Sequence, residues 1–168
     1  MKLPDELADR LGRYIDARNA QILEQLGEGK DGHVFRIAHG SPLGTSAVKI
    51  FFNGEIYERE RDAYFRLQLH DAYIIQGLNI PQLIDFDDIL QVIEISIVQP
   101  PYIVDFASAY LDEPPDFGAD RTEEAREKIR ELFDDRANDV FSVLDQMQNA
   151  YGIWYFDAQP GNINFGNG

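Results

Sequence analysis

Apolar residues recur at every fourth position near the N-terminus, at Leu3, Leu7, Leu11 and Ile15. This spacing aligns them on one helical face and predicts an amphipathic helix over residues 4–19, with Pro4 suited to its first turn. Apolar and polar residues then alternate over residues 21–26 and 33–38, and residues 46–52 are almost continuously apolar. Alternation is typical of half-buried strands, and a continuous run is typical of a buried strand. We therefore expect two strands around a glycine-rich turn, followed by a third, buried strand.

The rest of the chain alternates between strand-like and helical patterns. A helix is predicted over residues 55–69, and strands over 81–86 and 90–98. Proline removes a donor from a ladder of strand hydrogen bonds, so Pro100-Pro101 ends the sheet. Beyond it we expect a short helix at 103–111, a linker loop at 112–119 and one long helix from 120 to 151 that ends at Gly152. The order of elements predicts an α+β fold with two lobes.

Composition narrows the class of protein. With 168 residues and 44% hydrophobic content, one compact domain is expected. The net charge of −15 makes this an acidic protein and argues against nucleic acid or anionic lipid as a partner. The chain has no cysteine, and its histidines show no metal-ligand spacing. No membrane span or apolar leader is visible, so a cytoplasmic protein is the expectation.

A glycine cluster joins the first two predicted strands. Gly27, Gly29 and Gly32 form the pattern G-x-G-x-x-G, and the residues that follow are strand-like. A dinucleotide-binding turn opens a helix instead, so a strand–turn–strand flap is the better interpretation. Without Cβ atoms, its backbone N–H groups can approach phosphate oxygens. The alternative is an ordinary glycine-rich hairpin.

The third predicted strand contains one lysine, in the apolar run Ala47-Val48-Lys49-Ile50. A buried lysine needs a partner if it is to keep its charge, and Glu60 on the next predicted helix can supply one. The alternative is a lysine that reaches solvent from the end of a strand.

The segment after the long helix reads D-x-x-P-x-N, from Asp157 to Asn162. An aspartate and an asparagine at this spacing on a proline-shaped loop can orient a hydroxyl and hold a metal ion. The alternative is a turn, because Asp, Pro, Gly and Asn are common turn residues.

Together, in this order, the three segments resemble the protein-kinase-like superfamily, which includes the aminoglycoside phosphotransferases. The resemblance covers about residues 22–165. Its motifs are the flap G-x-G-x-x-G-x-V, the lysine of V-A-I-K and its helix glutamate, and the Asp and Asn of the catalytic loop. The matching residues are Gly27, Gly29, Gly32 and Val34; Lys49; Glu60, with Glu58 as a competing candidate; and Asp157 and Asn162.

The resemblance implies a kinase-like two-lobed fold, with an antiparallel-sheet N-lobe over residues 1–99 and a hinge and reduced, mostly helical C-lobe over 100–168. It also implies that ATP and Mg²⁺ are bound. Lys49, held by Glu60, would bind the α- and β-phosphates, Asp157 would orient the acceptor hydroxyl, and Asn162 with Asp157 would hold the metal. The nucleotide would also contact the flap, and the residues implied there and nearby are Gly27, Gly29, Lys30, Gly32, Val34, Ala47 and Tyr102.

The sequence departs from the family in several places. Tyr155-Phe156 replaces the usual His-Arg, and Gln159 stands where protein kinases often carry a lysine. The family's metal-binding Asp-Phe-Gly lies on a strand hairpin after the Asn, where this chain has only Asn164-Phe165-Gly166. A core that stops after its catalytic loop leaves apolar surface exposed, which favours a homodimer. Because no Lys or Arg lies between Arg66 and Arg121 or after Arg136, we expect no cation on the C-lobe side of the site.

Three functions follow from this sequence. The first is an ATP- and magnesium-dependent phosphotransferase that acts on a hydroxyl of a small molecule or a protein. The second is a catalytically inactive, pseudokinase-like scaffold or regulatory module. The third is an interaction protein whose acidic surface meets a basic partner, for which the segment 67–120, free of Lys and Arg, is the motivation.

Overall fold

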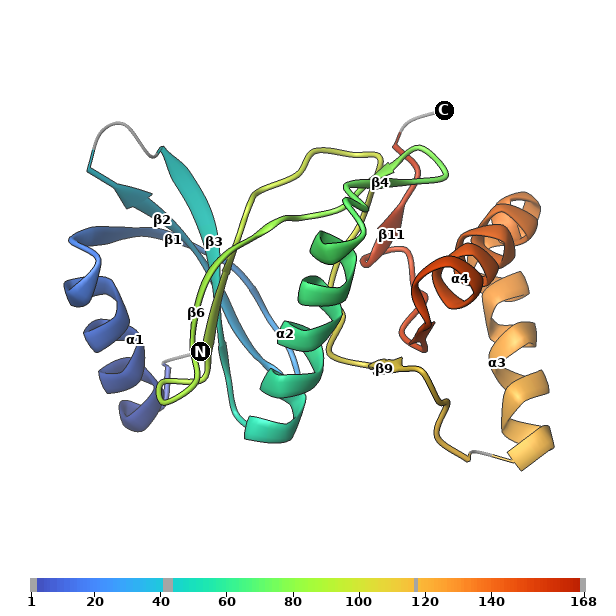
Figure 1. Ribbon diagram of the computed structural model, residues 1–168, viewed down its shortest axis with the longest axis horizontal. Coiled ribbons are helices and arrows are strands. Elements are labelled where there is room, and N and C mark those ends of the chain that lie inside the picture. The colour runs from blue at the N-terminus through green and yellow to red at the C-terminus, as the bar shows by residue number, and fades with distance from the viewer. Residues whose placement is uncertain (1–2, 41–43, 117, 167–168) are drawn as a thin grey trace. The chain divides into compact units, whose positions relative to one another are not determined.

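The computed structural model describes residues 3–40, 44–116 and 118–166 of an α+β protein (Figure 1). Its backbone divides into two compact units, Met1–Arg61 with Gln82–Ile97 and Asp62–Pro81 with Val98–Gly168. The elements of the first unit are α1 (Asp5–Ala17), β1 (Ala20–Glu28), β2 (Gly32–His39), β3 (Thr45–Phe51), β6 (Leu83–Asp87), β7 (Val92–Ile95) and the start of α2 (Gly54–Leu69).

The second unit contains the rest of α2 and two small sheets. Its remaining elements are β4 (Ile74–Ile75), β5 (Leu78–Asn79), β8 (Tyr102–Ile103), β9 (Ala109–Leu111), α3 (Gly118–Phe133), the short 3₁₀ helix η1 (Asp134–Arg136), α4 (Ala137–Tyr151), β10 (Ile153–Tyr155) and β11 (Ile163–Asn164). Strands β11, β8, β5 and β4 form one sheet in that order, and β10 pairs with β9.

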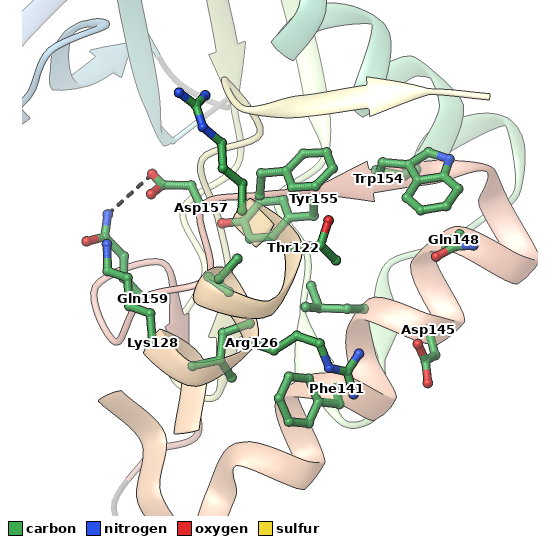
Figure 2. Close-up of a pocket in the computed structure, with 17 residues that line it drawn as sticks. Thr122, Arg126, Lys128, Phe141, Asp145, Gln148, Trp154, Tyr155, Asp157 and Gln159 are labelled. Atoms are coloured by element: carbon green, nitrogen blue, oxygen red, sulfur yellow. Dashed lines mark hydrogen bonds between the residues drawn. The ribbon is translucent and has the colours of Figure 1, made fainter. Parts of the chain in front are cut away.

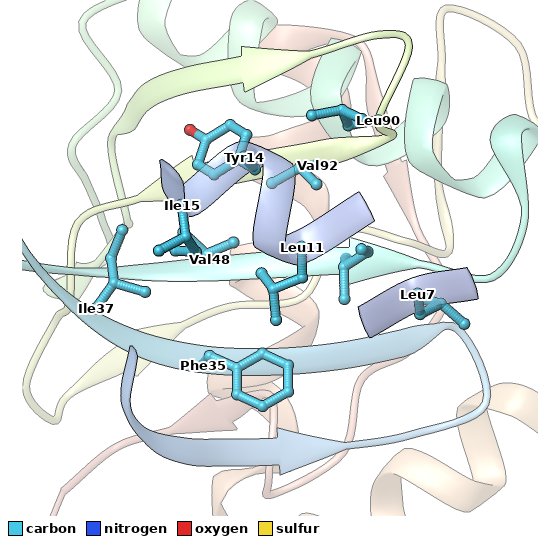
Figure 3. Packing of buried hydrophobic residues seen from close by; sticks show 10 residues of the cluster. Leu7, Leu11, Tyr14, Ile15, Phe35, Ile37, Val48, Leu90 and Val92 are labelled. Atoms are coloured by element: carbon cyan, nitrogen blue, oxygen red, sulfur yellow. The ribbon is translucent and has the colours of Figure 1, made fainter. Parts of the chain in front are cut away.

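The first unit is an antiparallel sheet of order β1-β2-β3-β7-β6 with α1 packed on one face. Figure 3 shows the apolar side of α1, with Leu7, Leu11 and Ile15, against Phe35 and Val48 of the sheet. Since side chains alternate along a strand, neighbouring residues of β2 and β3 belong to the opposite face. The predicted amphipathic helix and the first three predicted strands are therefore confirmed.

A buried polar cluster ties α1 to this sheet. Glu94 on β7 accepts hydrogen bonds from the Tyr14 hydroxyl (2.9 Å) and the Ser46 hydroxyl (2.6 Å), and its Oε1 lies 2.6 Å from His39 Nε2. Burial, and then the negative charge of Glu94, raise the pKa of the Tyr14 hydroxyl. Tyr14 is thus a neutral donor that anchors the helix to a buried carboxylate.

Two predicted helices are wrong. Residues 103–111 form no helix, because β8 and β9 occupy the two ends of this segment and Asp105 has a φ of 61°. The predicted long helix is broken into α3, η1 and α4, and Asp134 at the break has a φ of 47°. A positive φ is incompatible with a right-handed helix. Within the described residues, no helix combines the length and apolarity needed to cross a bilayer.

Candidate functional site

Lys49 and Glu60 form a buried ion pair within the first unit. Lys49 lies in β3 between Val34 of β2 and Ile93 of β7, and its Nζ is 2.6 Å from Glu60 Oε2 on α2. The two residues are only 5% and 1% exposed, respectively. Glu58, the competing candidate, is exposed to solvent. The structure therefore confirms that Lys49 is buried and that Glu60 is its partner.

The glycine cluster forms the turn between β1 and β2. Gly29 N–H donates to the Gly32 carbonyl (3.0 Å), and Gly27 pairs with Val34 across the hairpin. A Cβ on Gly32 would lie 2.1 Å from the Ile50 carbonyl oxygen, so the packing of the protein requires glycine there. A Cβ on Gly27 or Gly29 would meet no atom within 4 Å. The protein's own packing therefore gives no reason for glycine at these two positions.

The other predicted nucleotide contacts are divided between the units. Val34 lies directly opposite Lys49, and Ala47 precedes Lys49 by two residues in β3, so both share its face of the sheet. Lys30 is exposed at the tip of the hairpin. Tyr102 lies in β8 of the second unit, where it pairs with Asn164 on one side and Asn79 on the other.

The predicted catalytic loop connects β10 to β11 in the second unit. Asn162 is 8% exposed, and its Nδ2 donates to the carboxylate of Asp157 (2.8 Å) and to the Asp157 backbone carbonyl (3.0 Å). Gln159 Nε2 donates to the same carboxylate oxygen (3.3 Å), and the Gln159 carbonyl accepts the Asn162 N–H (2.8 Å). The structure thus brings Asp157 and Asn162 into direct contact on one loop.

A segment that the sequence analysis assigned to a helix lies next to this loop. Strand β8 pairs antiparallel with β11, and Val104 N–H donates to the Asn162 carbonyl (2.9 Å). Asp105 follows immediately, in a left-handed conformation, and its Oδ1 accepts the Ala107 N–H (3.2 Å). The chain therefore places Asp105-Phe106-Ala107 on a turn beside the Asp157–Asn162 loop.

Phe106 fixes this segment through aromatic contacts. Its ring is fully buried and meets the edge of Tyr64 of α2 (5.0 Å between centroids) and of Tyr155 of β10 (5.5 Å). The Tyr155 hydroxyl also donates to the Val104 carbonyl (2.9 Å). Edge-to-face aromatic pairs of this kind add about 0.5–1.5 kcal/mol each beyond area burial. Two residues before the predicted catalytic Asp157, Tyr155 thus holds the Asp105 segment in place.

A pocket of about 220 Å³ opens beside Asp157 within the second unit (Figure 2). Its lining includes Arg121, Arg126 and Lys128 from α3. The expectation that this side of the site has no cation is therefore wrong. No Lys or Arg lies between Arg66 and Arg121 in the sequence, but the fold places the cations of α3 in the same pocket as Asp157.

The donor atoms near Asn162 suit a hard cation. The described residues contain no group of three or more His, Cys, Asp or Glu side chains placed to hold a metal. Asp157 and Asn162 instead offer a carboxylate and an amide in direct contact. Asp105 adds a carboxylate on the neighbouring segment, where its Oδ1 accepts the Ala107 N–H. Oxygen donors of this type suit Mg²⁺, which usually takes one or two protein carboxylates and keeps other positions for water or phosphate.

No protein-family model matches this chain, and no curated protein matches it either.

Proposed function

We propose that this chain is a kinase-like nucleotide-binding protein that transfers the γ-phosphoryl group of ATP to a hydroxyl, with Mg²⁺ as cofactor. The buried Lys49–Glu60 pair beside the glycine hairpin carries this proposal. Burying an ion pair rarely stabilises a fold more than apolar residues of the same volume. A lysine retained at such a position is therefore better explained by a ligand than by the core.

In this proposal the first unit binds the phosphates of the nucleotide. Glu60 holds the Lys49 ammonium in one orientation, from which it would bind α- and β-phosphate oxygens. The hairpin covers the phosphates with backbone N–H groups. The open space at Gly27 and Gly29 supports this role, because a side chain there would obstruct a ligand and nothing else.

The second unit supplies the reacting groups. Asp157 accepts the proton of the acceptor hydroxyl as the acceptor oxygen bonds to the γ-phosphorus and the bond to the bridging oxygen breaks, releasing ADP. Both Asn162 hydrogen bonds use Nδ2, so Asn162 Oδ1 and the Asp157 carboxylate would hold the metal, with Asp105 as a further carboxylate on the neighbouring segment. The chemistry that Mg²⁺ would supply there is neutralisation of negative charge on the phosphates.

We extend the proposal to a kinase-like two-lobed fold in which one segment is out of order. Asp105-Phe106-Ala107 takes the place of the family's Asp-Phe-Gly hairpin, but it precedes α3 and α4 instead of following Asn162. Three features support this assignment: the β8–β11 pairing, the left-handed Asp105, and the contacts of Phe106 with Tyr64 and Tyr155.

Transfer of the γ-phosphate from radiolabelled ATP, to water or to an added alcohol, tests the proposal. We expect Mg²⁺-dependent turnover that falls at least 100-fold in Asp157→Asn, because removal of a catalytic base typically costs about 10²–10⁴ in rate. Asp135→Asn is the matched control, since Asp135 is an exposed carboxylate of η1 outside the loop. No turnover in the wild type, or equal turnover in the two variants, would contradict the phosphotransferase.

One observation favours a nucleotide-binding scaffold without catalysis as the second candidate. Gln159 and Asn162 both donate to the same Asp157 oxygen, so its lone pairs are already occupied where a substrate hydroxyl would need an acceptor. Saturable Mg·ATP binding with no phosphoryl transfer identifies this function. In that case Gln159→Lys, which replaces the second donor with a cation, is the first variant to examine for recovered turnover.

A further inference from the structure

We propose that the pocket beside Asp157 binds the acceptor, and that the acceptor is a one-ring alcohol carrying a carboxylate or a phosphate. This inference rests on the proposed function, because it gives Asp157 the hydroxyl on which it acts. The charge of the pocket supports the anionic group of the acceptor, and its apolar walls and volume support the ring. Its position beside Asp157 supports the hydroxyl.

The charge on α3 is divided between the pocket and the outside. From Arg121 onward, the helix contributes Arg121, Arg126 and Lys128 to the lining, together with uncharged residues. Over the same span, the acidic residues Glu123, Glu124, Glu127 and Glu131 lie outside the lining. In a chain of net charge −15, a wall with cations alone is a local exception that attracts an anion.

Arg126 has a fixed position on this wall. Its guanidinium carbon lies 4.5 Å from the ring centroid of Phe141 on α4, which also lines the pocket. A cation over an aromatic face is stabilised by the ring and loses less freedom when it binds an anion. The planar guanidinium then matches carboxylate or phosphate oxygens in pairs.

The remaining walls and the volume suit one ring. Phe141, Leu144, Ile153 and Trp154 give the pocket an apolar lining next to its cations. An apolar cavity of about 150 Å³ holds benzene, so about 220 Å³ accommodates a ring with small substituents. We therefore infer a small molecule as the acceptor.

The position of Asp157 fixes where the hydroxyl lies. In Figure 2, Asp157 and Gln159 line one end of the pocket, near Lys128, and Trp154, Gln148 and Asp145 line the other. Asp145 and Asp157 are the pocket's two carboxylates, against three cations on α3. A ligand that places a hydroxyl at Asp157 and an anionic group near α3 is attracted by the cationic wall. A cationic ligand in the same place would be repelled by it.

Trp154 is the only tryptophan of the chain, so its emission reports on this pocket without any need for turnover. The probes are para-(hydroxymethyl)benzoate and para-(hydroxymethyl)phenyl phosphate, compared with the neutral amide and the cationic benzylamine of the same shape. We expect both anions to bind at least about tenfold more tightly than the amide, as one charge-assisted contact implies. The tighter of the two identifies the anionic group.

Two glutamine variants locate the binding site. Arg126→Gln should weaken anion binding about tenfold, and Arg136→Gln, which removes the same charge from an exposed arginine of η1 outside the lining, should not. The inference is overturned if the benzylamine or the amide binds as tightly as the anions, or if both variants behave alike. It is equally overturned if neither Trp154 emission nor the melting temperature responds to any probe.

The experiment separates this inference from the proposed function. ATP turnover with no binding of the anionic probes removes the inference and leaves the phosphotransferase. Anion binding that is weakened by Arg126→Gln and not by Arg136→Gln, without phosphorylation of the bound alcohol by Mg·ATP, removes the phosphotransferase and leaves an anion-binding pocket.

Discussion

Replacing Lys49 by Met should lower the free energy of unfolding, because it removes one partner of the buried ion pair. The side chains are of similar length, so the change removes the charge and its 2.6 Å contact with Glu60 while filling most of the same space. Glu60, which is 1% exposed, then loses the positive charge of Lys49 beside it. Removing one partner of such a pair typically costs about 3–5 kcal/mol.

Protonation of the Glu60 carboxyl in this variant limits the electrostatic cost. An ordinary glutamate can be held neutral at pH 7 for about 3.7 kcal/mol, and at pH 5 for about 1 kcal/mol. The folded variant therefore binds a proton that the unfolded chain does not, so its stability should rise as the pH is lowered. We expect a loss of about 3–4 kcal/mol at pH 7 that shrinks to about 1 kcal/mol at pH 5.

Urea unfolding at both pH values, with wild type measured in parallel, gives these differences. The double variant Lys49→Met/Glu60→Leu is the control, because an apolar pair leaves no charge behind and should return stability to within about 1 kcal/mol of wild type at either pH. A loss below about 1 kcal/mol in Lys49→Met, independent of pH, would refute the reasoning. It would mean that water reaches Glu60 and that the pair is not buried.

Three further predictions concern stability. Tyr14→Phe removes the hydroxyl that donates to Glu94 and should lower the unfolding free energy by about 1–2 kcal/mol in urea, and no change would argue against the buried cluster. Phe106→Ala leaves a cavity in a fully buried aromatic cluster and should cost about 3–5 kcal/mol by the same measurement, so a loss below about 1 kcal/mol would be inconsistent with that packing. The hydrogen bond from Arg66 lowers the pKa of Asp112, so this carboxyl stabilises the fold above its ordinary pKa and the contribution is lost as the pH falls. The difference in melting temperature between wild type and Asp112→Asn should therefore be constant above about pH 5 and disappear toward about pH 3, and a pH-independent difference would oppose this explanation.

Periodicity predicted the elements whose faces are set by a large core. The spacing of Leu7, Leu11 and Ile15 identified α1 because these residues share one buried stripe. The apolar run around Lys49 identified β3 because both faces of that strand are covered. In such elements, burial of a face directly determines which nearby positions of the sequence are apolar.

Periodicity failed where elements are very short or where one residue interrupts them. Strands β8 and β11 are two residues long, so they contain no repeat that a pattern could detect. At Asp105 and Asp134 the chain adopts a positive φ, which aspartate tolerates better than most residues. Aspartate is also found within ordinary helices, so the sequence alone did not distinguish these two turns from helix.

The same limit applies to the candidate site. Lys49 and Glu60 were predictable as partners because one strand and the helix that follows it bring them together. Asp105 was missed because its place beside Asn162 depends on the pairing of β8 with β11, which are distant in sequence. The tripeptide Asp105-Phe106-Ala107 was the available signal, but it precedes the catalytic loop and lay within a predicted helix.

The most direct test of the central claim is the stability that Mg·ATP adds to two folded proteins, wild type and Lys49→Met/Glu60→Leu, measured by chemical unfolding with Mg·ATP and with ATP in EDTA. At about 100 times its dissociation constant, Mg·ATP should add about 2.7 kcal/mol to the wild type. It should add little to the double variant, and ATP in EDTA should add less to the wild type than Mg·ATP does. Equal stabilisation of both proteins, or of neither, would contradict a nucleotide site built on Lys49.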